Sequence, residues 1–502
     1  MRPRTPHLTQ IAVSVVGRTS QLALLQLLLA AAVTIQSTGR SHAETPCPSG
    51  AITVEPGASI QAAVDHAGNG ATFCLKSGIH RMQAIRPRPG QSFHGEDQTV
   101  LNGSSLLTSF SREGRYWVAT WRPVRVRQRG DCAKTAPGCD LPENVFFNDR
   151  PLVQVLKKED LDSGRYYLDR PNDKIYFIDD PTGLKVEMAV MAYAFESTAP
   201  NVLITNVIIE KYATSPQKGA IQAEQATAWT VENCEVRLSS AAAITAGVGT
   251  RIRRCRIHDN GQIGVTGSGR DIRVEDNQIW MNNTRGFDPG WEAGGVKIAY
   301  GDGSVFRSNH IHDNFGPGLW CDGDCRNTDY DSNIIERNHG AGIFHEISYN
   351  ATIRNNVVRH NGITENEWLW GSDILIAGSQ DVEVYGNTVT VSPGKCAIML
   401  IDQGRDDRPH RRRGPLYKTQ NNKIHDNDIT FEGVACAGGA SDVKPGHESF
   451  TIITNGHNMF DRNIYRVPRA NPRVQFEWGH TTLDWDGLRG KGLELHGRLL
   501  PY

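Results

Sequence analysis

The hexapeptide NQIWMN at residues 277–282 returns as NHIHDN at 309–314, NIIERN at 333–338 and NVVRHN at 356–361. Each copy carries an asparagine, a β-branched residue two positions later and a second asparagine three positions after that. The frame of the first asparagine extends to further positions, at spacings between 21 and 35 residues: Asn206, Cys234, Cys255, Asn387 and Asn422. A basic period in the low twenties with insertions indicates a solenoid of stacked repeats.

Three apolar columns recur once per repeat. The first follows the leading asparagine and is β-branched throughout: Ile208, Val236, Ile257, Ile279, Ile311, Ile335, Val358, Val389 and Ile424. The second comprises Ile221, Ile244, Val265, Val296, Leu319, Ile343, Ile374 and Ile398, and the third comprises Val231, Ile252, Val274, Ile353 and Val384. Stacked strands lie about 4.8 Å apart, so three columns predict three parallel sheets around one narrow core.

The second asparagine of the motif forms a polar column of its own: Asn260, Asn282, Asn314, Asn338, Asn361 and Asn427. An asparagine amide can hydrogen-bond both the local turn and the copy on the next repeat. We therefore expect structural ladders here rather than ligand contacts.

Segments outside the repeat define the expected domains. Residues 59–67 have the pattern of a short amphipathic helix, and aromatic-rich segments interrupt the repeat between about residues 110 and 187. Phe476, Trp478 and Trp485 are expected to seal the far end. The prediction is a signal peptide at 1–43, an N-terminal cap and first coil at 44–109, a β-rich insertion at 110–190, coils at 191–440 and a C-terminal coil and cap at 441–502.

The first residues have the features of an export signal. Arg2, Arg4 and Arg18 precede an apolar run from Leu22 to Ile35, and a small-residue cleavage site stands at 41–43. The run is shorter than the ~20 residues of a membrane span. We expect a secreted or periplasmic protein with no membrane contact in its mature form; an uncleaved anchor is the alternative.

Cysteine and charge usage fit that location. All ten cysteines follow the signal. We expect Cys132 with Cys139 and Cys321 with Cys325 to close loops, Cys47 with Cys74 to fix the N-terminal end, and two others to be buried thiols: Cys234 and Cys255. The net charge of -1 gives no global attraction to nucleic acid. We expect a monomer.

From about residue 51 to 465, these columns resemble the right-handed parallel β-helix superfamily, which includes pectate lyases, polygalacturonases and alginate epimerases. The resemblance implies an all-β solenoid and a polysaccharide as substrate or ligand. It leaves the chemistry open, because this fold carries several activities.

Strand alternation predicts a candidate site on the second sheet. If Val296, Leu319 and Ile343 point inward, then Lys297, Trp320 and Phe344 point outward on three consecutive coils, with Asp322 and Glu346 two residues further along. We expect these five side chains to form one exposed cluster. Aromatic faces stack on sugar rings, while carboxylates and lysine serve proton transfer.

Two insertions, at 280–294 and 364–372, are expected to form the walls of this cluster. Their residues Asp288, Trp291, Glu292 and Trp370 are expected to contact the substrate. The tetrapeptide at 286–289 is similar to an alginate-epimerase motif, with Gly290 at the position of that family's histidine. Arginines at 405, 408 and 411–413 should protrude as a basic loop, which is either solvated or in contact with an anionic polymer.

Two assignments stay open at this stage. Strict alternation turns His345 into the core, whereas a bulge would turn it outward as a candidate catalytic base. Asp322 and Asp324, between two cysteines, offer oxygen ligands for Ca²⁺. A disulfide-closed turn without metal is the interpretation we favour, and no cofactor is assigned.

The leading functional hypothesis is an enzyme that acts on a polysaccharide, such as a uronate polymer, by β-elimination or C5 epimerisation, with Lys297 or His345 as the base. A glycoside hydrolase that uses Asp322 and Glu346 is the alternative within the enzyme class. A non-catalytic glycan-binding surface or matrix protein is the alternative from another class.

Overall fold

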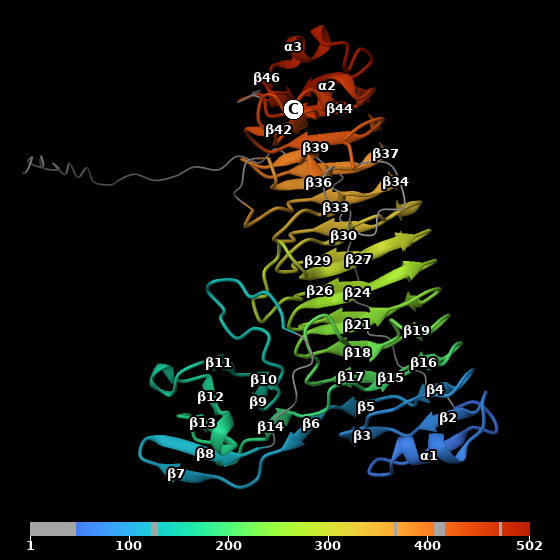
Figure 1. Cartoon of the computed structure of the whole chain (residues 1–502), viewed down its shortest axis with the longest axis vertical. Coiled ribbons are helices and arrows are strands. Elements are labelled where there is room, and N and C mark those ends of the chain that lie inside the picture. Colours follow the sequence, from blue (N-terminus) through green and yellow to red (C-terminus); the bar gives the residue numbers. More distant parts are fainter. Residues whose placement is uncertain (1–46, 122–128, 366–368, 406–416, 471–473) are drawn as a thin grey trace, which may run out of the picture. The chain divides into compact units, whose positions relative to one another are not determined.

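The computed structural model describes residues 47–121, 129–365, 369–405, 417–470 and 474–502. The expected signal peptide lies outside the described residues. Within them, three long parallel sheets, here called A, B and C, enclose one core (Figure 1). No helix in the described ranges is long and apolar enough to cross a membrane.

From β16 to β45, each coil contributes one strand to each sheet, in the order A, B, C. Sheet A contains β1 (Ile52–Val54), β2 (Thr72–Leu75), β4 (Ser92–Gly95), β16 (Leu203–Thr205), β19 (Thr230–Glu232), β22 (Arg251–Arg253), β25 (Arg273–Glu275), β28 (Val305–Arg307), β31 (Thr328–Asp331), β34 (Tyr349–Arg354), β37 (Gln380–Tyr385), β40 (Lys423–His425) and β43 (Met459–Asp461). Sheet B contains β3 (Gly78–Arg81), β5 (Thr99–Asn102), β17 (Ile208–Glu210), β20 (Glu235–Arg237), β23 (Arg256–His258), β26 (Gln278–Trp280), β29 (His310–His312), β32 (Ile334–Glu336), β35 (Val357–Arg359), β38 (Thr388–Val391), β41 (Asp428–Phe431), β44 (Ile464–Val467) and β47 (Arg498–Pro501). Sheet C contains β15 (Phe195–Glu196), β18 (Gly219–Gln222), β21 (Ala242–Ala246), β24 (Ile263–Arg270), β27 (Gly294–Asp302), β30 (Leu319–Asp322), β33 (Ile343–Glu346), β36 (Ser372–Ala377), β39 (Cys396–Asp402), β42 (Ala435–Ser441), β45 (Val474–Gly479) and β46 (Thr481–Leu483).

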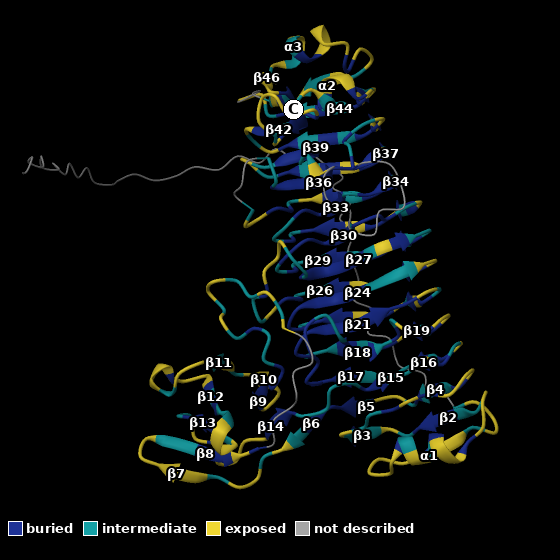
Figure 2. Ribbon diagram, viewed as in Figure 1, coloured by how far each residue is buried: buried dark blue, intermediate teal, exposed yellow. Residues whose placement is uncertain are grey.

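The predicted apolar columns are inward-facing rows of these sheets. Every predicted member of the second column, from Ile221 to Ile398, is in register with the next along sheet C. The third column lies in sheet A, where Phe306 and Tyr330 fill two coils between Val274 and Ile353. These rows are buried, as the dark blue strands of Figure 2 show.

The first column lies in sheet B, and its prediction is wrong at the N-terminal end. Ile209, not Ile208, is in register with Val236. The backbone amide of Glu235 donates to the carbonyl of Val207, so Val207 rather than the preceding asparagine takes the anchor position in this coil. The predicted alignment of this coil with the next coil was therefore displaced by one residue.

The same column is also wrong at its C-terminal end. Ile424 lies in sheet A opposite Val384, and Ile429 continues the first column after Val389. Asn422, taken as the anchor of this coil, lies five residues before the true anchor, Asn427. Because both residues are asparagines five positions apart, the motif matched in the wrong frame.

The asparagines form two hydrogen-bonded ladders along the turns on either side of sheet B. In each step between two asparagines, the side-chain oxygen of one asparagine accepts from the backbone amide and from the side-chain amide of the asparagine one coil earlier. Asn338 Oδ1, for example, lies 3.1 Å from Asn314 N and 2.9 Å from Asn314 Nδ2. One ladder runs through Asn277, Asn309, Asn333, Asn356, Asn387, Asn427 and Asn463 to Glu494. The other runs through Asn260, Asn282, Asn314, Asn338 and Asn361 to Asp373. The assignment of Asn427 to the second ladder is thus corrected.

Helices cover the ends of the coils. α1 (Ile60–His66) lies within the predicted range 59–67; the side chain of its N-cap residue Ser59 accepts from the amide of Ala62, and the helix buries Ile60 and Val64. At the other end are α2 (Ile452–Asn455) and α3 (Trp485–Gly490). Phe476 and Trp478 are buried there, as expected of sealing residues.

The three expected disulfides are present: Cys47–Cys74, Cys132–Cys139 and Cys321–Cys325. A fourth, which the sequence did not indicate, joins Cys396 to Cys436. These two cysteines are register partners on β39 and β42, although 40 residues separate them in the chain. The thiols of Cys234 and Cys255 are free and buried, as predicted.

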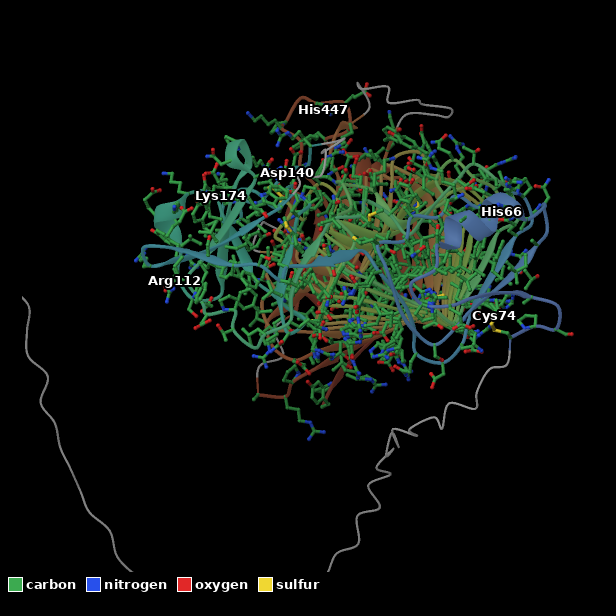
Figure 3. All side chains as sticks on the ribbon, turned by 90° about the horizontal axis from the view of Figure 1, so that it is seen from below. His66, Cys74, Arg112, Asp140, Lys174 and His447 are labelled. Carbon is green, nitrogen blue, oxygen red and sulfur yellow. A yellow bond between two sulfur atoms is a disulfide. The ribbon has the colours of Figure 1, made fainter. Side chains whose placement is uncertain are left out.

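The predicted β-rich insertion forms two small sheets after β5. One contains β10 (Arg150–Pro151), β9 (Val145–Phe147), β14 (Val186–Ala189) and β6 (Ser104–Leu106). The other contains β11 (Val153–Val155), β12 (Arg165–Asp169), β13 (Lys174–Phe177), β8 (Tyr116–Thr120) and β7 (Ser111–Glu113), with 3-10 turns at Lys158–Asp160 and Arg170–Asn172. Figure 3, seen along the coils, places Arg112 and Lys174 of the insertion on the side opposite His66 of α1.

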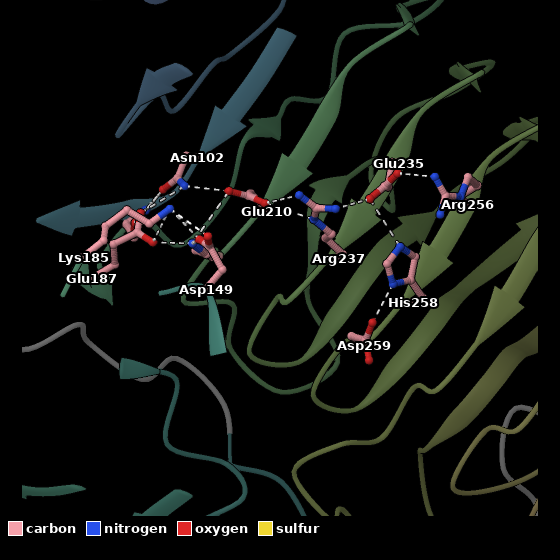
Figure 4. Close-up of polar contacts among 12 residues, drawn as sticks. Asn102, Asp149, Lys185, Glu187, Glu210, Glu235, Arg237, Arg256, His258 and Asp259 are labelled. Carbon is pink, nitrogen blue, oxygen red and sulfur yellow. Dashed lines mark hydrogen bonds and ion pairs between the residues drawn. The ribbon is translucent and has the colours of Figure 1, made fainter. Parts of the chain in front are cut away.

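A buried ion network ties the insertion to the coils (Figure 4). The ammonium of Lys211, directly after β17, contacts the carboxylates of Asp149 and Glu187, and the guanidinium of Arg81 lies 2.7 Å from Glu187. Burial would raise the pKa of Glu187, but the hydrogen bonds from Lys211 and Arg81 outweigh it and hold the pKa below its usual value. The network continues from coil to coil through Glu210 to Arg237, Glu235, His258 and Asp259.

Replacing Lys211 with Met should destabilise the protein by roughly 3 to 5 kcal/mol, because it removes the fully buried cation that contacts Glu187 and leaves that buried carboxylate with only the more exposed Arg81 and Lys185. Lys185→Met removes a half-exposed partner of the same Asp149 and should cost less than about 1 kcal/mol. Urea unfolding of both variants measures the difference. Equal losses in the two variants would contradict the assignment of Lys211 as the central cation.

The end of the second ladder should make stability depend on pH. Burial raises the pKa of Asp373 to about 7, against hydrogen bonds from Asn361. Since the unfolded value is about 3.9, the contribution of Asp373 to stability is fully present below about pH 4. It falls by about 1.4 kcal/mol per pH unit as the pH rises from there to about 7, and it changes no further above that.

Asp373→Asn keeps the acceptor oxygen and removes the charge, so its melting temperature should exceed that of the wild type more at pH 8.5 than at pH 5. Asp442→Asn, at an exposed aspartate, is the control and should change neither. A gain that is the same at both pH values would show that Asp373 does not titrate in this way.

Candidate functional site

The register of sheet C brings the predicted site residues together. Lys297 on β27 pairs with Trp320 on β30, which pairs with Phe344 on β33. Asp322 on β30 pairs with Glu346 on β33. The predicted cluster therefore exists, because inward-facing Val296, Leu319 and Ile343 fix the outward direction of their neighbours.

Lys297 is the centre of the cluster. Its Nζ lies 2.9 Å from Asp322 Oδ2 and 3.2 Å from Glu292 Oε1, and it donates to the carbonyl of Trp291 at 2.5 Å. The ammonium also lies 3.5 Å from the ring centroid of Trp320, within cation–π range. All of its donor capacity is thus directed at groups of the protein.

The aromatic residues stack along the sheet. Trp320 and Phe344 have ring centroids 5.1 Å apart, and Trp370 from the later insertion meets Phe344 edge-on at 6.2 Å. These side chains belong to a small apolar cluster with Leu375 and Met399 of the next coils. The rings of Trp320 and Phe344 are therefore packed against neighbouring side chains on sheet C and are not freely exposed.

The expectation of an exposed cluster is wrong. Lys297 is 3 % exposed, Trp320 2 %, Glu346 5 % and Phe344 8 %, whereas 23 % of the Asp322 side chain is accessible. The insertion that carries Glu292 covers Lys297, and Trp370 from the second insertion covers Phe344. The site is a covered cluster in which Asp322 is the most accessible of these groups.

Glu346 is a carboxyl group with an unusual protonation equilibrium. Burial raises its pKa to about 7, and the negative charge of Asp322 adds to the rise. Arg405, whose guanidinium lies 3.3 Å from Glu346 Oε1, and Lys297 oppose it. Gln403 Nε2 also donates to Glu346 at 3.4 Å. The group can therefore be protonated or ionised near neutral pH.

Lys297 stays protonated. Burial lowers its pKa, but the charges of Asp322 and Glu292 outweigh burial and raise the pKa above its usual value. Burial also raises the pKa of Glu292, which Lys297 opposes. A lysine in this state supplies a fixed positive charge rather than a proton acceptor.

His345 faces the core and points away from the cluster around Lys297. It is fully buried in the row of Cys321 and Ile376, its Nδ1 lies 3.2 Å from the hydroxyl of Tyr330, and burial lowers its pKa to about 3. The proposed bulge is absent at this position of β33. His345 is thus a neutral core residue, and its assignment as a candidate base is corrected.

The first insertion is built around a buried phenylalanine. Phe287 packs with Cys132 and Cys139 of the β-rich insertion, next to Trp291. Asp288 is exposed, and its side chain accepts from the amide of Gly290 at 2.9 Å. The tetrapeptide that is similar to an epimerase motif therefore shapes a turn, in which the carbonyl of Asp288 accepts from the amide of Trp291 at 3.1 Å.

The two carboxylates considered for Ca²⁺ point to different partners. Asp322 is paired with Lys297, while Asp324 is buried and accepts from the hydroxyl of Tyr417 at 3.0 Å. In the described ranges one cluster has ligand groups close enough for a metal, at Cys47, Cys74 and Glu96, and its cysteines form a disulfide. The donor set at Asp322 does not fit a calcium ion.

The basic loop contributes one described residue to the site, Arg405. The arginines at 408 and 411–413 lie outside the described residues. The roles of Arg405 and Gln403 as partners of Glu346 were not predicted. The only signal in the sequence was the length of the insertion that follows Asn387, which places extra chain beside this strand.

Comparisons with known proteins agree with the architecture. The family described as right handed beta helix region matches residues 196–290 and 219–389. The complex of XylC with xylose is similar with a TM-score of 0.66 and 16% identity, over 88% of this chain and 82% of that chain. A glycoside hydrolase gives a TM-score of 0.50 and 12% identity, over 71% and 89%. The Azotobacter vinelandii mannuronan C-5 epimerase AlgE6 A-module gives 0.47 and 14%, over 88% and 94%.

The chain is therefore a right-handed parallel β-helix protein, as the columns predicted. No curated protein matches the sequence. At these identities the XylC and glycoside hydrolase structures establish the fold alone.

Proposed function

We propose that the protein is a glycoside hydrolase that retains the configuration of its substrate, with Asp322 as the nucleophile and Glu346 as the acid and base. The observation that carries this proposal is one carboxyl pair, in register on β30 and β33, whose members have different surroundings. Asp322 has a cation at 2.9 Å, whereas Glu346 is buried and has a pKa of about 7.

The spacing of the pair supports retention. Register partners on adjacent strands are about 4.8 Å apart. Retaining glycosidases hold their two carboxyl groups about 5 to 5.5 Å apart, and inverting enzymes hold them about 6.5 to 9.5 Å apart to admit a water molecule. Side chains from directly paired positions suit the shorter distance.

The reaction follows from these states. The Asp322 carboxylate attacks the anomeric carbon while the bond to the leaving oxygen breaks, and Glu346 gives its proton to that oxygen. Water then attacks the same carbon, Glu346 takes a proton from the water, and the bond to Asp322 breaks. The products are two sugar fragments, and both carboxyl groups return to their starting states.

Lys297 is a positioning residue in this scheme. Its ammonium pairs with the carboxylate of Asp322 and orients it, and the contact with Trp320 holds the lysine against that ring. Trp320 is almost fully covered, so Trp291 and Trp370, which are partly exposed, are the aromatic residues better placed to meet a sugar ring.

β-Elimination or C5 epimerisation is the second candidate. It requires a base that removes the proton at C5 of a uronate. Lys297 is protonated and fully engaged, and His345 lies in the core, so neither expected base is supported. The xylose bound to the similar XylC structure supports a carbohydrate as the ligand class. Secretion or export to the periplasm remains part of the proposal.

The first test is the pH profile. Because Glu346 must be protonated to act as the acid, kcat/KM should fall as the pH rises through about 7. Glu346→Gln should lower kcat/KM by ~10² to 10⁴ and remove this alkaline limb. Reducing ends released from xylan, pectin, alginate and glycosaminoglycans measure the activity.

Dinitrophenyl glycosides serve as the control, since their leaving group needs no proton, and Glu346→Gln should retain the first step with them. If Glu346→Gln retains full activity on polysaccharide, the assignment is wrong. Elimination also creates reducing ends, so the discriminating product is the other fragment: an unsaturated uronate at its non-reducing end would favour the elimination candidate.

The second test changes the surroundings of Glu346 without touching the carboxyl pair. Arg405→Gln removes a positive charge that holds the pKa of Glu346 down, so the alkaline limb should move to higher pH. Lys418→Gln, which removes a more distant cation paired with Glu448, is the matched control and should leave the limb in place. An unchanged limb in Arg405→Gln would exclude Glu346 as the titrating group.

A further inference from the structure

A cavity lies beside sheet C, several coils before the carboxyl pair. It has a volume of about 510 Å³ next to β15 and β18 and is lined among others by Arg86, Tyr193, Glu196, Lys218, Gln222 and Glu224. None of these residues was singled out by the sequence pattern. In Figure 1, β18 lies in the same column of strands as β27, β30 and β33.

The lining combines an aromatic ring with hydrogen-bonding groups. Arg86 Nε donates to the Tyr193 hydroxyl at 3.0 Å, and its guanidinium lies 6.0 Å from the centroid of the same ring. The Tyr193 side chain is therefore held in place at the cavity, with an amide group supplied by Gln222. A ring face beside amide and hydroxyl groups is the mixture that binds a sugar.

The charges of the cavity are balanced. Lys218 forms an ion pair with Glu224, and Arg86 lies 3.9 Å from Glu196. Each cation in the lining thus has an anion beside it, so the cavity offers no net charge to a uronate. Its composition fits a neutral sugar residue.

The sheet connects the cavity to the carboxyl pair. Gln222 is in register with Thr245, which is followed by Thr266 and then by Lys297. In the neighbouring outward row, the partly exposed Ser268 and Ala299 precede Asp322. Ser268 and Ala299 therefore give a partly exposed path of small side chains toward Asp322, whereas Thr245 and Thr266 in the row of Gln222 are buried. Four strand spacings, about 19 Å, separate β18 from β30.

We propose that this cavity is a distal subsite for a neutral glycan chain, which extends along sheet C so that its scissile bond lies at Asp322 and Glu346. The inference rests on the proposed hydrolase function for the position of the scissile bond. It adds that the substrate is a chain of several neutral sugar residues, held at a distance from the reacting bond by Tyr193 and Gln222.

The test uses oligosaccharides of two to eight residues from xylan, mannan and starch, with oligogalacturonates as charged probes. In the full-length protein, Tyr193→Ala should raise KM about tenfold for the longest chains of the neutral series that is cleaved, the loss of about 1.4 kcal/mol of binding. It should leave kcat and the KM of the shortest cleaved chains unchanged. Gln222→Ala should act in the same direction.

Tyr502→Ala is the matched control, because Tyr502 is an exposed tyrosine at the far end of sheet B, and it should change neither parameter. Calorimetric binding of the same probes to Glu346→Gln and to the double variant Glu346→Gln/Tyr193→Ala separates the subsite from the chemistry. Length-dependent binding that needs Tyr193, without hydrolysis by the wild type, would uphold the cavity and refute the proposed function.

Three results would overturn the subsite. One is equal binding of short and long chains by the wild type and both cavity variants. Another is an absence of binding for every neutral series at millimolar concentration. The third is a Tyr193→Ala effect confined to oligogalacturonates, which would contradict the neutral character assigned to the cavity.

Discussion

The in-register stacking of coils is the constraint on which the rest of the structure depends. Each ladder asparagine satisfies a backbone amide and a side-chain amide of the coil before it, as Asn338 does for Asn314. A slip of one residue would leave these buried polar groups without partners, at a cost of about 1 to 3 kcal/mol for each group. The ladders therefore fix the register of the sheet B strands between them, and through the continuous coils they limit the register of sheet C.

The geometry of the candidate site follows from that register. Asp322 and Glu346 are neighbours because Leu319 and Ile343 are neighbours in the core three residues earlier on the same strands. The sheet thus supplies the separation of the two carboxyl groups without any contribution from the loops. The loops supply what the sheet does not: the cover over Lys297 and the partners of Glu346.

This division explains what could be predicted from the sequence. The sheet C column and the cluster around Lys297 follow from a period of two within strands, which is local. Ile208 and Ile424 were misplaced because turn lengths vary and a second asparagine can mimic the anchor. The burial of Phe344 and the contact of Arg405 with Glu346 depend on how the insertions fold back over the sheet. The spacing of residues in the sequence does not determine how those insertions fold.

The two carboxyl groups also show how one regular backbone can give equivalent positions different surroundings. β30 and β33 present Asp322 and Glu346 at equivalent positions, so the strands themselves do not distinguish them. The difference arises because Lys297 lies 2.9 Å from Asp322, whereas Glu346 is more deeply buried and is paired with the more exposed Arg405. Because Arg405 belongs to the segment that follows β39, a change of loops can change the surroundings of Glu346 while the solenoid stays the same, which is why the fold alone does not determine the activity.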